Sequence, residues 1–540
     1  MNTKIICSLA FSIIAATAQA EGIKQFEIPF GNQLPSSGVD GSVTVDIDST
    51  KITKTIVEKK FYGVDTNGFS KLPQTSSVMP LQLGFVRLGG NLYSTYNWET
   101  NSYYDGNDGG IQYVYAPLET RIRQVQQAYK AIPMFQINMM GWMPDLNEVH
   151  GMSYMNTATA QHAANAITYL NGVEKLGVKN IIIDNEPFDW KDTHGKELPS
   201  ADEYIAKYIE YVVALRSAQE NLTQDANDIK IWGPEIASGW NGWQTTHPKD
   251  CVIDYTLPEK MKCSYGNGKF REFISYFLSK LAAFENDSVR NPKHYKMLDY
   301  LTFHYYPLFR SSFEDTTSVI TNAEGKQDIK AMLESVNIWN MANYINSVDA
   351  ASPKGIAPAL INKFTAWRDS FYPTAKIAVT EYGIDSVDKV VYHPIIEPMY
   401  LADLMARVAS SGVETFVNSF LEGGRWGMLE KEYKTRQYYV YSLYSNFFLG
   451  KIAKSSDTFG DSVNTYSTKT ETSTNVFLVN KSAKETTTKV NFKINQSSSE
   501  VTELALPAWS VTVLSVPNDK SAPIKVYQYG ALEMGINVTE

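Results

Sequence analysis

The chain has 540 residues, of which 43% are hydrophobic and 20% are charged, and its formal net charge is −9. This composition is ordinary for a globular protein and excludes a wholly disordered or fibrous chain. The acidic balance also lacks the basic surplus of nucleic-acid-binding proteins, so we expect no nucleic-acid partner.

The first twenty residues carry the pattern of a secretory signal peptide. Lys4 supplies a positive charge, residues 5–16 form an apolar run, and a small-residue cleavage site at 18–20 precedes Glu21. A membrane anchor is the alternative, but an apolar segment needs about 20 residues to span a bilayer. We therefore expect residues 1–20 to be removed, a mature chain starting near Glu21, a secreted or periplasmic location and no membrane association.

The longest part of the chain, 61–448, alternates short β-rich runs with longer amphipathic stretches, a pattern typical of βα units around a parallel sheet. The β-rich runs are 61–65, 85–90, 132–138, 178–186, 229–235, 298–306, 376–383 and 414–422. Apolar residues recur at helical spacing in segments such as 117–131, 202–220 and 395–410. Eight such units predict an α/β fold, a (β/α)8 TIM barrel.

A second region of different character follows at 449–540. Thr, Ser, Val and Lys alternate there in runs such as 474–481, 486–495 and 509–516, which predicts an appended antiparallel β-sandwich domain. The same alternation occurs before the barrel at 41–48 and 52–59. We therefore expect residues 21–60 to contribute N-terminal strands to that β-sandwich.

Two cysteines remain once Cys7 has left with the signal peptide. Cys251 and Cys263 bracket a short polar segment, and in an exported protein they form the one possible intramolecular disulfide. Two free thiols are the alternative. Neither these cysteines nor the seven histidines show the spacing of a zinc site, and we expect no cofactor to be required. The acidic loop 105–108 could hold a structural calcium, but it matches no EF-hand pattern and reads better as a solvated loop.

Two glutamates carry the strongest chemical signal. Glu186 follows the apolar run 178–183 in an Asp-Asn-Glu-Pro motif, and Glu381 follows 376–379 in Thr-Glu-Tyr-Gly. Both stand at the carboxyl ends of predicted strands, and a closed barrel brings such ends to one mouth. Cleavage of a glycosidic bond needs two carboxyl groups that flank it. The pair therefore predicts a retaining glycosidase, in which Asn185 contacts a sugar hydroxyl and His304 and Tyr306 hold the second carboxylate.

Aromatic residues make up 12% of the chain, and six of its ten tryptophans follow predicted strand ends. An indole face can stack on a sugar ring, although any single tryptophan can equally belong to the core. The six candidate substrate-binding tryptophans are Trp98, Trp142, Trp190, Trp240, Trp243 and Trp426.

Several motifs resemble glycoside hydrolase family 44, a family of endoglucanases and xyloglucanases. They are Arg-Leu-Gly-Gly-Asn at 87–91 with Tyr-Asn-Trp-Glu at 96–99, Asp-Asn-Glu-Pro at 184–187, Gly-Trp-Asn-Gly at 239–242, His-Tyr-Tyr-Pro at 304–307 and Thr-Glu-Tyr at 380–382. The resemblance implies a (β/α)8 barrel with a β-sandwich, Glu186 as acid/base and Glu381 as nucleophile. Positions matching the family's cleft are Arg87, Asn91, Trp98, Asn185, Trp240, His304 and Tyr306. The sequence after Glu381 and after 96–99 departs from the family pattern. These segments lie around the expected cleft, so the departures affect which substrate we expect more than which chemistry.

The expected activity is an endo-β-1,4-glucanase that cleaves a β-glucan polysaccharide such as cellulose, xyloglucan or mixed-linkage glucan, acting as a monomer by double displacement. Retention predicts that the two carboxyl groups lie about 5–5.5 Å apart. One alternative is an exo-acting or short-substrate β-glycosidase of a related barrel clan. The other is a non-catalytic carbohydrate-binding protein.

Overall fold

The computed structural model describes residues 22–536, except for 35–37, 47–52, 54, 67, 106–109, 145–155, 238–246, 254–260, 313–314, 316, 353, 386–389, 496–497 and 520. The predicted signal peptide lies outside the described residues. The acidic loop 105–108 falls outside them except for Asp105.

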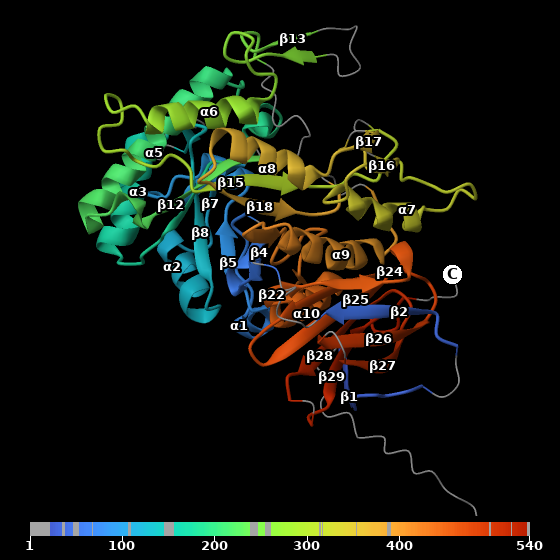
Figure 1. The fold of residues 1–540 in the computed structure, drawn as a ribbon. Helices are drawn as coiled ribbons and strands as arrows, with labels where there is room; N and C mark the ends of the chain where they lie inside the picture. Colours follow the sequence, from blue (N-terminus) through green and yellow to red (C-terminus); the bar gives the residue numbers. More distant parts are fainter. Residues whose placement is uncertain are drawn as a thin grey trace, which may run out of the picture.

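A closed barrel of eight parallel strands forms the larger part of the molecule (Figure 1). Its strands are β4 (Tyr62–Asp65), β5 (Phe85–Leu88), β8 (Ile132–Ile137), β11 (Asn180–Ile183), β12 (Lys230–Ala237), β15 (Tyr300–Tyr305), β18 (Lys376–Tyr382) and β19 (Thr415–Asn418). They pair in chain order, and β19 closes the ring on β4. Each strand overlaps one of the eight predicted runs, so the predicted (β/α)8 barrel is confirmed.

Helices between the strands cover the barrel from outside. They are α1 (Thr75–Val78), α2 (Leu118–Arg123), α3 (Ala160–Ile167), α4 (Trp190–His194), α5 (Ala201–Thr223), α6 (Phe273–Glu285), α7 (Ile329–Glu334), α8 (Leu360–Phe371), α9 (Ile396–Ser410) and α10 (Arg436–Phe447). The longest, α5, begins at a capping box in which Ser200 and Glu203 bond each other's backbone N–H. Its buried face includes Ile205, Tyr208 and Val212, the apolar stripe read from the sequence.

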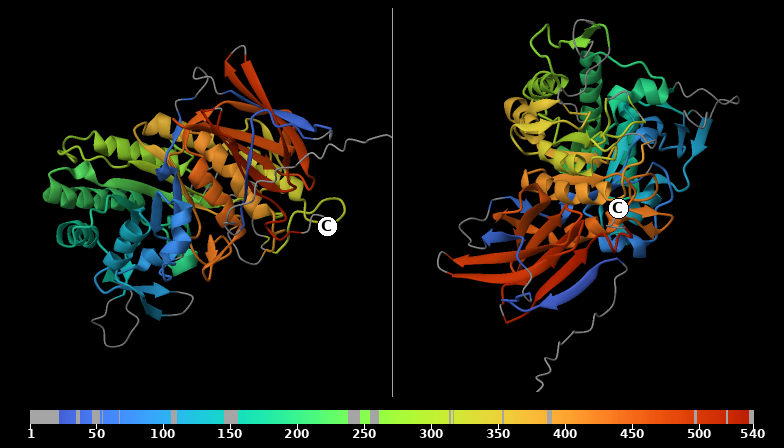
Figure 2. Two further views of the ribbon diagram at one scale, coloured as in Figure 1. Left: turned by 90° about the horizontal axis from the view of Figure 1, so that it is seen from below. Right: turned by 90° about the vertical axis from the view of Figure 1, so that its right-hand side faces the viewer.

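Two further sheets pack against each other beside the barrel (Figure 2). The seven-stranded sheet holds, in spatial order, β1 (Lys24–Ile28), β29 (Ile524–Tyr529), β28 (Ser510–Pro517), β25 (Ser473–Asn480), β24 (Val463–Lys469), β22 (Gly450–Ala453) and β3 (Ile56–Val57). The four-stranded sheet holds β23 (Ser455–Asp457), β2 (Gly41–Asp46), β26 (Thr486–Asn495) and β27 (Ser498–Leu506). Strands from before the barrel thus complete sheets formed by its C-terminal continuation.

One pairing departs from the predicted antiparallel arrangement, because β2 runs parallel to β26. A tight hairpin would force an antiparallel pair, but the whole barrel separates these two strands along the chain. The connection is therefore long enough for either direction.

The barrel meets the sandwich through α9 and α10, which pack on β25, β28 and β29. Figure 1 shows α9 and α10 between the barrel and the red strands of the sandwich. Asp403 of α9 is fully buried at this contact and accepts hydrogen bonds from Asn464 and Lys481 of the sandwich, at 2.6 and 2.8 Å. The two units therefore share one buried polar contact as well as apolar packing.

Several loops contain short two-stranded hairpins. They are β6 (Ser102–Asp105) with β7 (Gly110–Tyr113), β9 (Trp142–Met143) with β10 (Asn156–Thr157), β13 (Cys251–Ile253) with β14 (Met261–Cys263), β16 (Tyr344–Asn346) with β17 (Gly355–Ala357), and β20 (Leu429–Glu430) with β21 (Tyr433–Lys434). A disulfide joins Cys251 to Cys263 across β13 and β14.

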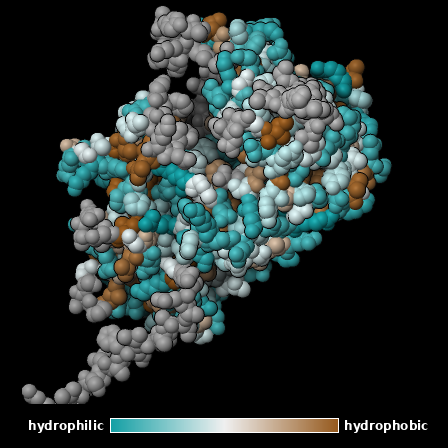
Figure 3. Space-filling view, turned by 180° about the vertical axis from the view of Figure 1, so that it is seen from behind, coloured by the Kyte–Doolittle hydropathy of each residue, from teal (hydrophilic) through white to brown (hydrophobic). Residues whose placement is uncertain are grey.

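The face seen in Figure 3 is mainly hydrophilic, with hydrophobic residues in small separate patches. Among the described residues, no helix combines the length and the apolar character needed to cross a bilayer.

Candidate active site

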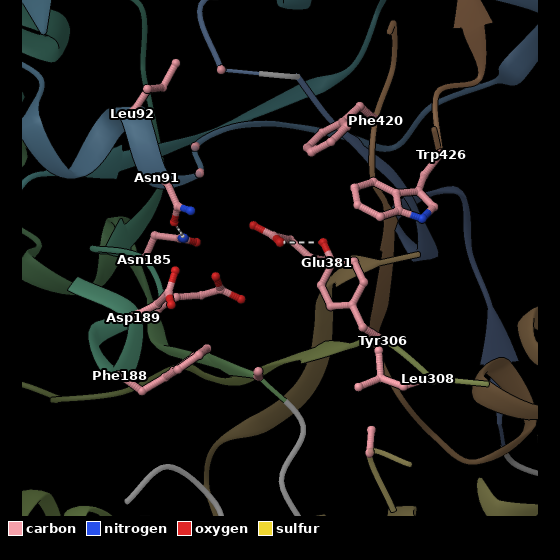
Figure 4. A pocket seen from close by; sticks show the side chains of 16 residues that line it. Asn91, Leu92, Asn185, Phe188, Asp189, Tyr306, Leu308, Glu381, Phe420 and Trp426 are labelled. Atoms are coloured by element: carbon pink, nitrogen blue, oxygen red, sulfur yellow. Dashed lines mark hydrogen bonds between the residues drawn. The ribbon is translucent and has the colours of Figure 1, made fainter. Parts of the chain in front are cut away.

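A cavity of about 540 Å³ opens at the carboxyl ends of the barrel strands. Its lining includes Asn185 and Glu186 after β11, Glu381 from β18 and Tyr306 after β15. Figure 4 shows Asn185 and Tyr306 on opposite sides of the cavity, with Glu381 pointing between them. The face of the barrel where its loops converge therefore holds both predicted glutamates.

The two glutamates face each other across this cavity. Each of Glu186, His304 and Glu381 offers one polar atom, and the three atoms lie within 4.8 Å of one another. Glu186 has a φ of 38°. This left-handed backbone conformation is uncommon outside glycine and is often found at functional sites. The chain therefore turns sharply at the residue that it presents to the cavity.

His304, at the end of β15, is fully buried between three carboxyl groups. Its Nδ1 lies 2.8 Å from Glu186 Oε1 and 3.3 Å from Glu381 Oε2, and its Nε2 lies 2.9 Å from Glu235 Oε2. Burial alone would lower the pKa of His304, but Glu381, Glu186 and Glu235 outweigh it and raise the pKa to about 10. His304 is therefore an imidazolium at neutral pH and donates from both ring nitrogens.

Arg87 of β5 lies in the same layer and is also fully buried. One guanidinium nitrogen donates to Glu381 Oε1 at 2.6 Å and pairs with Asp65. The other donates to Asn185 Oδ1 at 2.6 Å and to Glu235 Oε2 at 2.9 Å. This side chain thus ties β4, β12 and β18 to the residue that precedes Glu186.

The pKa values of the surrounding acids differ with their partners. Burial raises the pKa of Glu186, and the charge of Glu381 adds to the rise, against the hydrogen bond from His304. Burial also raises the pKa of Asp65, to about 7, although Arg87 opposes it. Burial would raise the pKa of Glu235 as well, but Arg87 and His304 outweigh it and lower the pKa. The site therefore raises the pKa of Glu186 and lowers that of the neighbouring Glu235.

Hydrogen bonds fix the remaining polar residues of the motif around Glu186. Asp184 accepts from Ser94 Oγ at 2.5 Å and from the backbone N–H of Met139 at 2.6 Å. Asn185 Nδ2 donates to Asn91 Oδ1 at 2.7 Å, a bond drawn in Figure 4. Trp190 Nε1 donates to the backbone oxygen of Asn185 at 2.9 Å. The turn that carries Glu186 is thus held from several sides.

Tyr306 holds the second glutamate in place. Its hydroxyl donates to Glu381 Oε2 at 2.7 Å and lies 3.2 Å from Ser419 Oγ. Both oxygens of Glu381 therefore accept a hydrogen bond, one from Tyr306 and one from Arg87.

The spacing of Glu186, His304 and Glu381 also satisfies the geometry of a cation site. Their chemistry fits such a site poorly. Both ring nitrogens of His304 already lie within hydrogen-bonding distance of carboxylate oxygens, and the Arg87 cation already contacts Glu381. The polar atoms of Glu186, His304 and Glu381 are therefore better suited to hydrogen-bond one another than to bind a metal ion.

The predicted tryptophans divide into three groups. Trp426 lines the cavity, and its Nε1 donates to the backbone oxygen of Ile384 at 2.8 Å. Trp98, Trp142 and Trp190 are not part of the cavity lining. Trp98 stacks on Tyr169, Trp142 lies under Lys196, and Trp190 is buried. Trp240 and Trp243 lie outside the described residues.

Several residues at the site were not predicted. Asp65 and Glu235 complete the buried charge cluster, while Leu92, Phe188, Asp189, Leu308 and Phe420 line the cavity. Asp65 and Glu235 each stand at the end of a predicted strand run, which was the available signal. Glu235 lies at an irregularity of β12 and has a φ of 54°, so the local backbone turns its side chain inward.

Comparison with known proteins gives the family context. The family model for glycoside hydrolase family 44 matches residues 131–308, a segment that includes Glu186, Glu235 and His304. Endoglucanase A of Paenibacillus lautus is 26% identical over 236 residues, which are 40% of this chain and 28% of that protein. The chain thus spans little more than a quarter of the length of this curated relative.

Solved structures share the fold over nearly the whole chain. CelM2, a bifunctional glucanase-xylanase from a metagenome library, has a TM-score of 0.63 at 18% identity and covers 89% of this chain and 100% of its own. A Paenibacillus polymyxa xyloglucanase from family 44, solved with xyloglucan, has a TM-score of 0.60 at 16% identity, with coverage of 90% and 98%. At these identities the likeness establishes the fold.

The resemblance to family 44 that was read from the sequence motifs is therefore confirmed by the family match and the curated relative. Together they support a glycosidase.

Proposed function

We propose that this protein is a retaining glycoside hydrolase that cleaves the backbone of a β-glucan within the chain, with Glu186 as acid/base and Glu381 as nucleophile. One observation carries the proposal: oxygens of the two carboxyl groups lie within 4.8 Å of each other across an open cavity. An inverting enzyme needs a gap of about 6.5–9.5 Å to admit water, whereas double displacement needs about 5–5.5 Å.

In the first step, a carboxylate oxygen of Glu381 attacks the anomeric carbon and the bond to the leaving glycosyl oxygen breaks. Glu186 donates its proton to that oxygen. Its raised pKa supports this role, since a donor must hold its proton at working pH. Arg87 and Tyr306 fix both oxygens of Glu381 and thereby aim the nucleophile.

In the second step, Glu186, now a carboxylate, takes a proton from water. The water oxygen attacks the anomeric carbon, and the bond from that carbon to Glu381 breaks. Two displacements at one carbon return the original configuration. The His304 imidazolium supports the first step, because it stabilises the negative charge that Glu186 acquires once its proton has left.

The cavity walls favour action within a chain. Figure 4 shows Phe188 on the wall opposite Phe420 and Trp426. Aromatic faces on both sides of the carboxyl pair allow sugar rings to stack in both directions from the scissile bond. The names of the relatives agree with this reading, since they include an endoglucanase and a xyloglucanase.

The test combines product analysis with two variants in which a glutamine replaces a glutamate of nearly the same shape. We expect the protein to release reducing ends from at least one soluble β-glucan, with an early fall in viscosity, and both Glu186→Gln and Glu381→Gln to lower the rate by at least about a hundredfold. Release of monosaccharide with viscosity intact would support the exo-acting alternative. Inactivity on every polymer and on aryl β-glycosides would contradict the enzyme assignment and favour a binding protein.

A further inference from the structure

A third carboxyl group, that of Asp189, lines the cavity beside the proposed acid/base. Its backbone is fixed: the Asp189 N–H donates to the backbone oxygen of Glu186 at 2.8 Å, and its own carbonyl accepts from Thr193 Oγ1 at 2.7 Å. Its side chain has no such constraint. Among the described residues, no group donates a hydrogen bond to either carboxylate oxygen of Asp189, although the side chain is half-buried.

An unpartnered carboxyl group in this position is unfavourable in the free protein. Burial raises its pKa to about 7, and the negative charges of Glu186 and Asp192 add to the rise. Such an uncompensated acid in a cavity commonly marks a group whose partner is the ligand. Near neutral pH it can accept a hydrogen bond as a carboxylate or donate one as an acid.

The location of Asp189 indicates which part of a ligand it meets. Glu186 hands its proton to the leaving oxygen, so the leaving sugar lies on the Glu186 side of the cavity. Asp189 follows Glu186 by one short turn, Pro187–Asp189. In Figure 4 Asp189 and Phe188 share one wall, opposite Phe420 and Trp426. Phe188 supplies an apolar face on that wall, and Asp189 supplies the polar atoms beside it.

We propose that Asp189 is a specificity-determining residue that hydrogen-bonds the hydroxyl groups of the leaving sugar and so selects glycosyl over hydroxyl-free leaving groups. This inference rests on the proposed function. The hydrogen bond aligns the leaving sugar so that its glycosidic oxygen meets the proton of Glu186.

The test compares two leaving groups in the full-length protein. For Asp189→Ala we expect kcat/KM on a β-1,4-gluco-oligosaccharide, whose leaving group is a sugar, to fall about 10- to 100-fold, the range for a hydrogen bond to a charged group. On 4-nitrophenyl β-cellobioside, whose leaving group carries no hydroxyl, the fall should stay below about threefold. Asp189→Asn keeps the size and the hydrogen-bonding capacity and should recover most of the lost activity on the oligosaccharide.

Glu197→Ala is the matched control. It removes one negative charge from the same stretch of chain, but Glu197 is exposed, does not line the cavity and is not among the charges that shift the pKa of Asp189. We expect it to leave kcat/KM on both substrates unchanged. Equal losses on the two substrates in Asp189→Ala would overturn the inference, as would an oligosaccharide rate that does not fall. A wild-type protein inactive on both substrates would instead remove the proposed function, and this inference with it.

Discussion

At the scale of single residues, His304 supplies a positive charge among the carboxyl groups of the site. Three carboxyl groups, from Glu186, Glu235 and Glu381, surround one buried imidazole. Without a cation between them, like charges at this spacing would resist simultaneous ionisation. The hydrogen bond from His304 lowers the pKa of Glu186 against the larger effect of burial, which raises it. His304 therefore lowers the pH above which Glu186, the proposed acid/base, loses its proton.

This gives a pH prediction for His304→Gln, which removes the charge. Without the imidazolium, ionised Glu186 is less stable, so its pKa rises and the alkaline limb of the kcat/KM profile moves to higher pH. The expected displacement is about one to two pH units, since a hydrogen bond to a charged group contributes about 1.5–3 kcal/mol. His162→Gln, in α3 and outside the cavity lining, should leave the limb in place. An alkaline limb that stays put or moves down in His304→Gln would contradict this role.

At the scale of elements, the residues of the candidate site stand at the ends of the barrel strands, whereas the longest helix lies apart from that site. The helix α5 contributes no residue to the cavity lining, and its first turn is closed by hydrogen bonds between Ser200 and Glu203. Loss of such a cap removes a partner from a helix N-terminus, where backbone N–H groups otherwise lack one.

Ser200→Ala should therefore lower the free energy of unfolding by about 1 kcal/mol, measured by denaturant titration, with kcat and KM unchanged. Ser279→Ala makes the same chemical change in the middle of α6, where the hydroxyl bonds only its own helix. It should change stability by less than about 0.5 kcal/mol. Equal effects in the two variants would show that capping is not the cause.

The elements also show what the sequence could and could not predict. The β-rich runs separated by amphipathic stretches were enough to predict all eight barrel strands, because hydrophobic periodicity is local. The roles of Asp65 and Glu235 were not predictable, since both depend on Arg87, which comes from another strand. Trp98 and Trp190 follow strand ends as Trp426 does, yet neither lines the cavity. Loop paths decide where such rings lie, and no short pattern records them.

At the scale of the whole molecule, Asp403 joins the barrel to the sandwich. Arg407 of the same helix donates to it at 3.0 Å, and Asn464, Lys481 and Tyr466 donate from the sandwich. Burial alone would raise the pKa of Asp403, but Arg407 and Lys481 outweigh it and hold the pKa well below its usual range. A carboxyl with a lowered pKa stabilises the fold above its unfolded-state pKa of about 4, and this contribution is lost as the pH falls further.

We expect Asp403→Asn to lower the free energy of unfolding at neutral pH by about 3–5 kcal/mol, because it leaves the buried Lys481 without its charge partner. The variant should also lose less stability than wild type between pH 5 and pH 3, where the carboxyl group of Asp403 takes up a proton in the unfolded wild-type chain but not in the folded protein. KM should not change, since Asp403 is outside the cavity lining. Asp461→Asn, an exposed acid of the sandwich, is the control and should be neutral. A neutral effect of Asp403→Asn would mean that the contact does not hold the two units together.

The most direct test of the central claim is azide rescue of Glu186→Ala and Glu381→Ala on an activated aryl β-cellobioside. If Glu381 is the nucleophile, azide takes its place in Glu381→Ala and attacks once, so the product is the α-glycosyl azide. If Glu186 is the acid/base, azide attacks the glycosyl-enzyme in Glu186→Ala, and the product is the β-glycosyl azide. Proton NMR distinguishes the two anomers. The account predicts the α product from Glu381→Ala and the β product from Glu186→Ala, and the opposite assignment would contradict it.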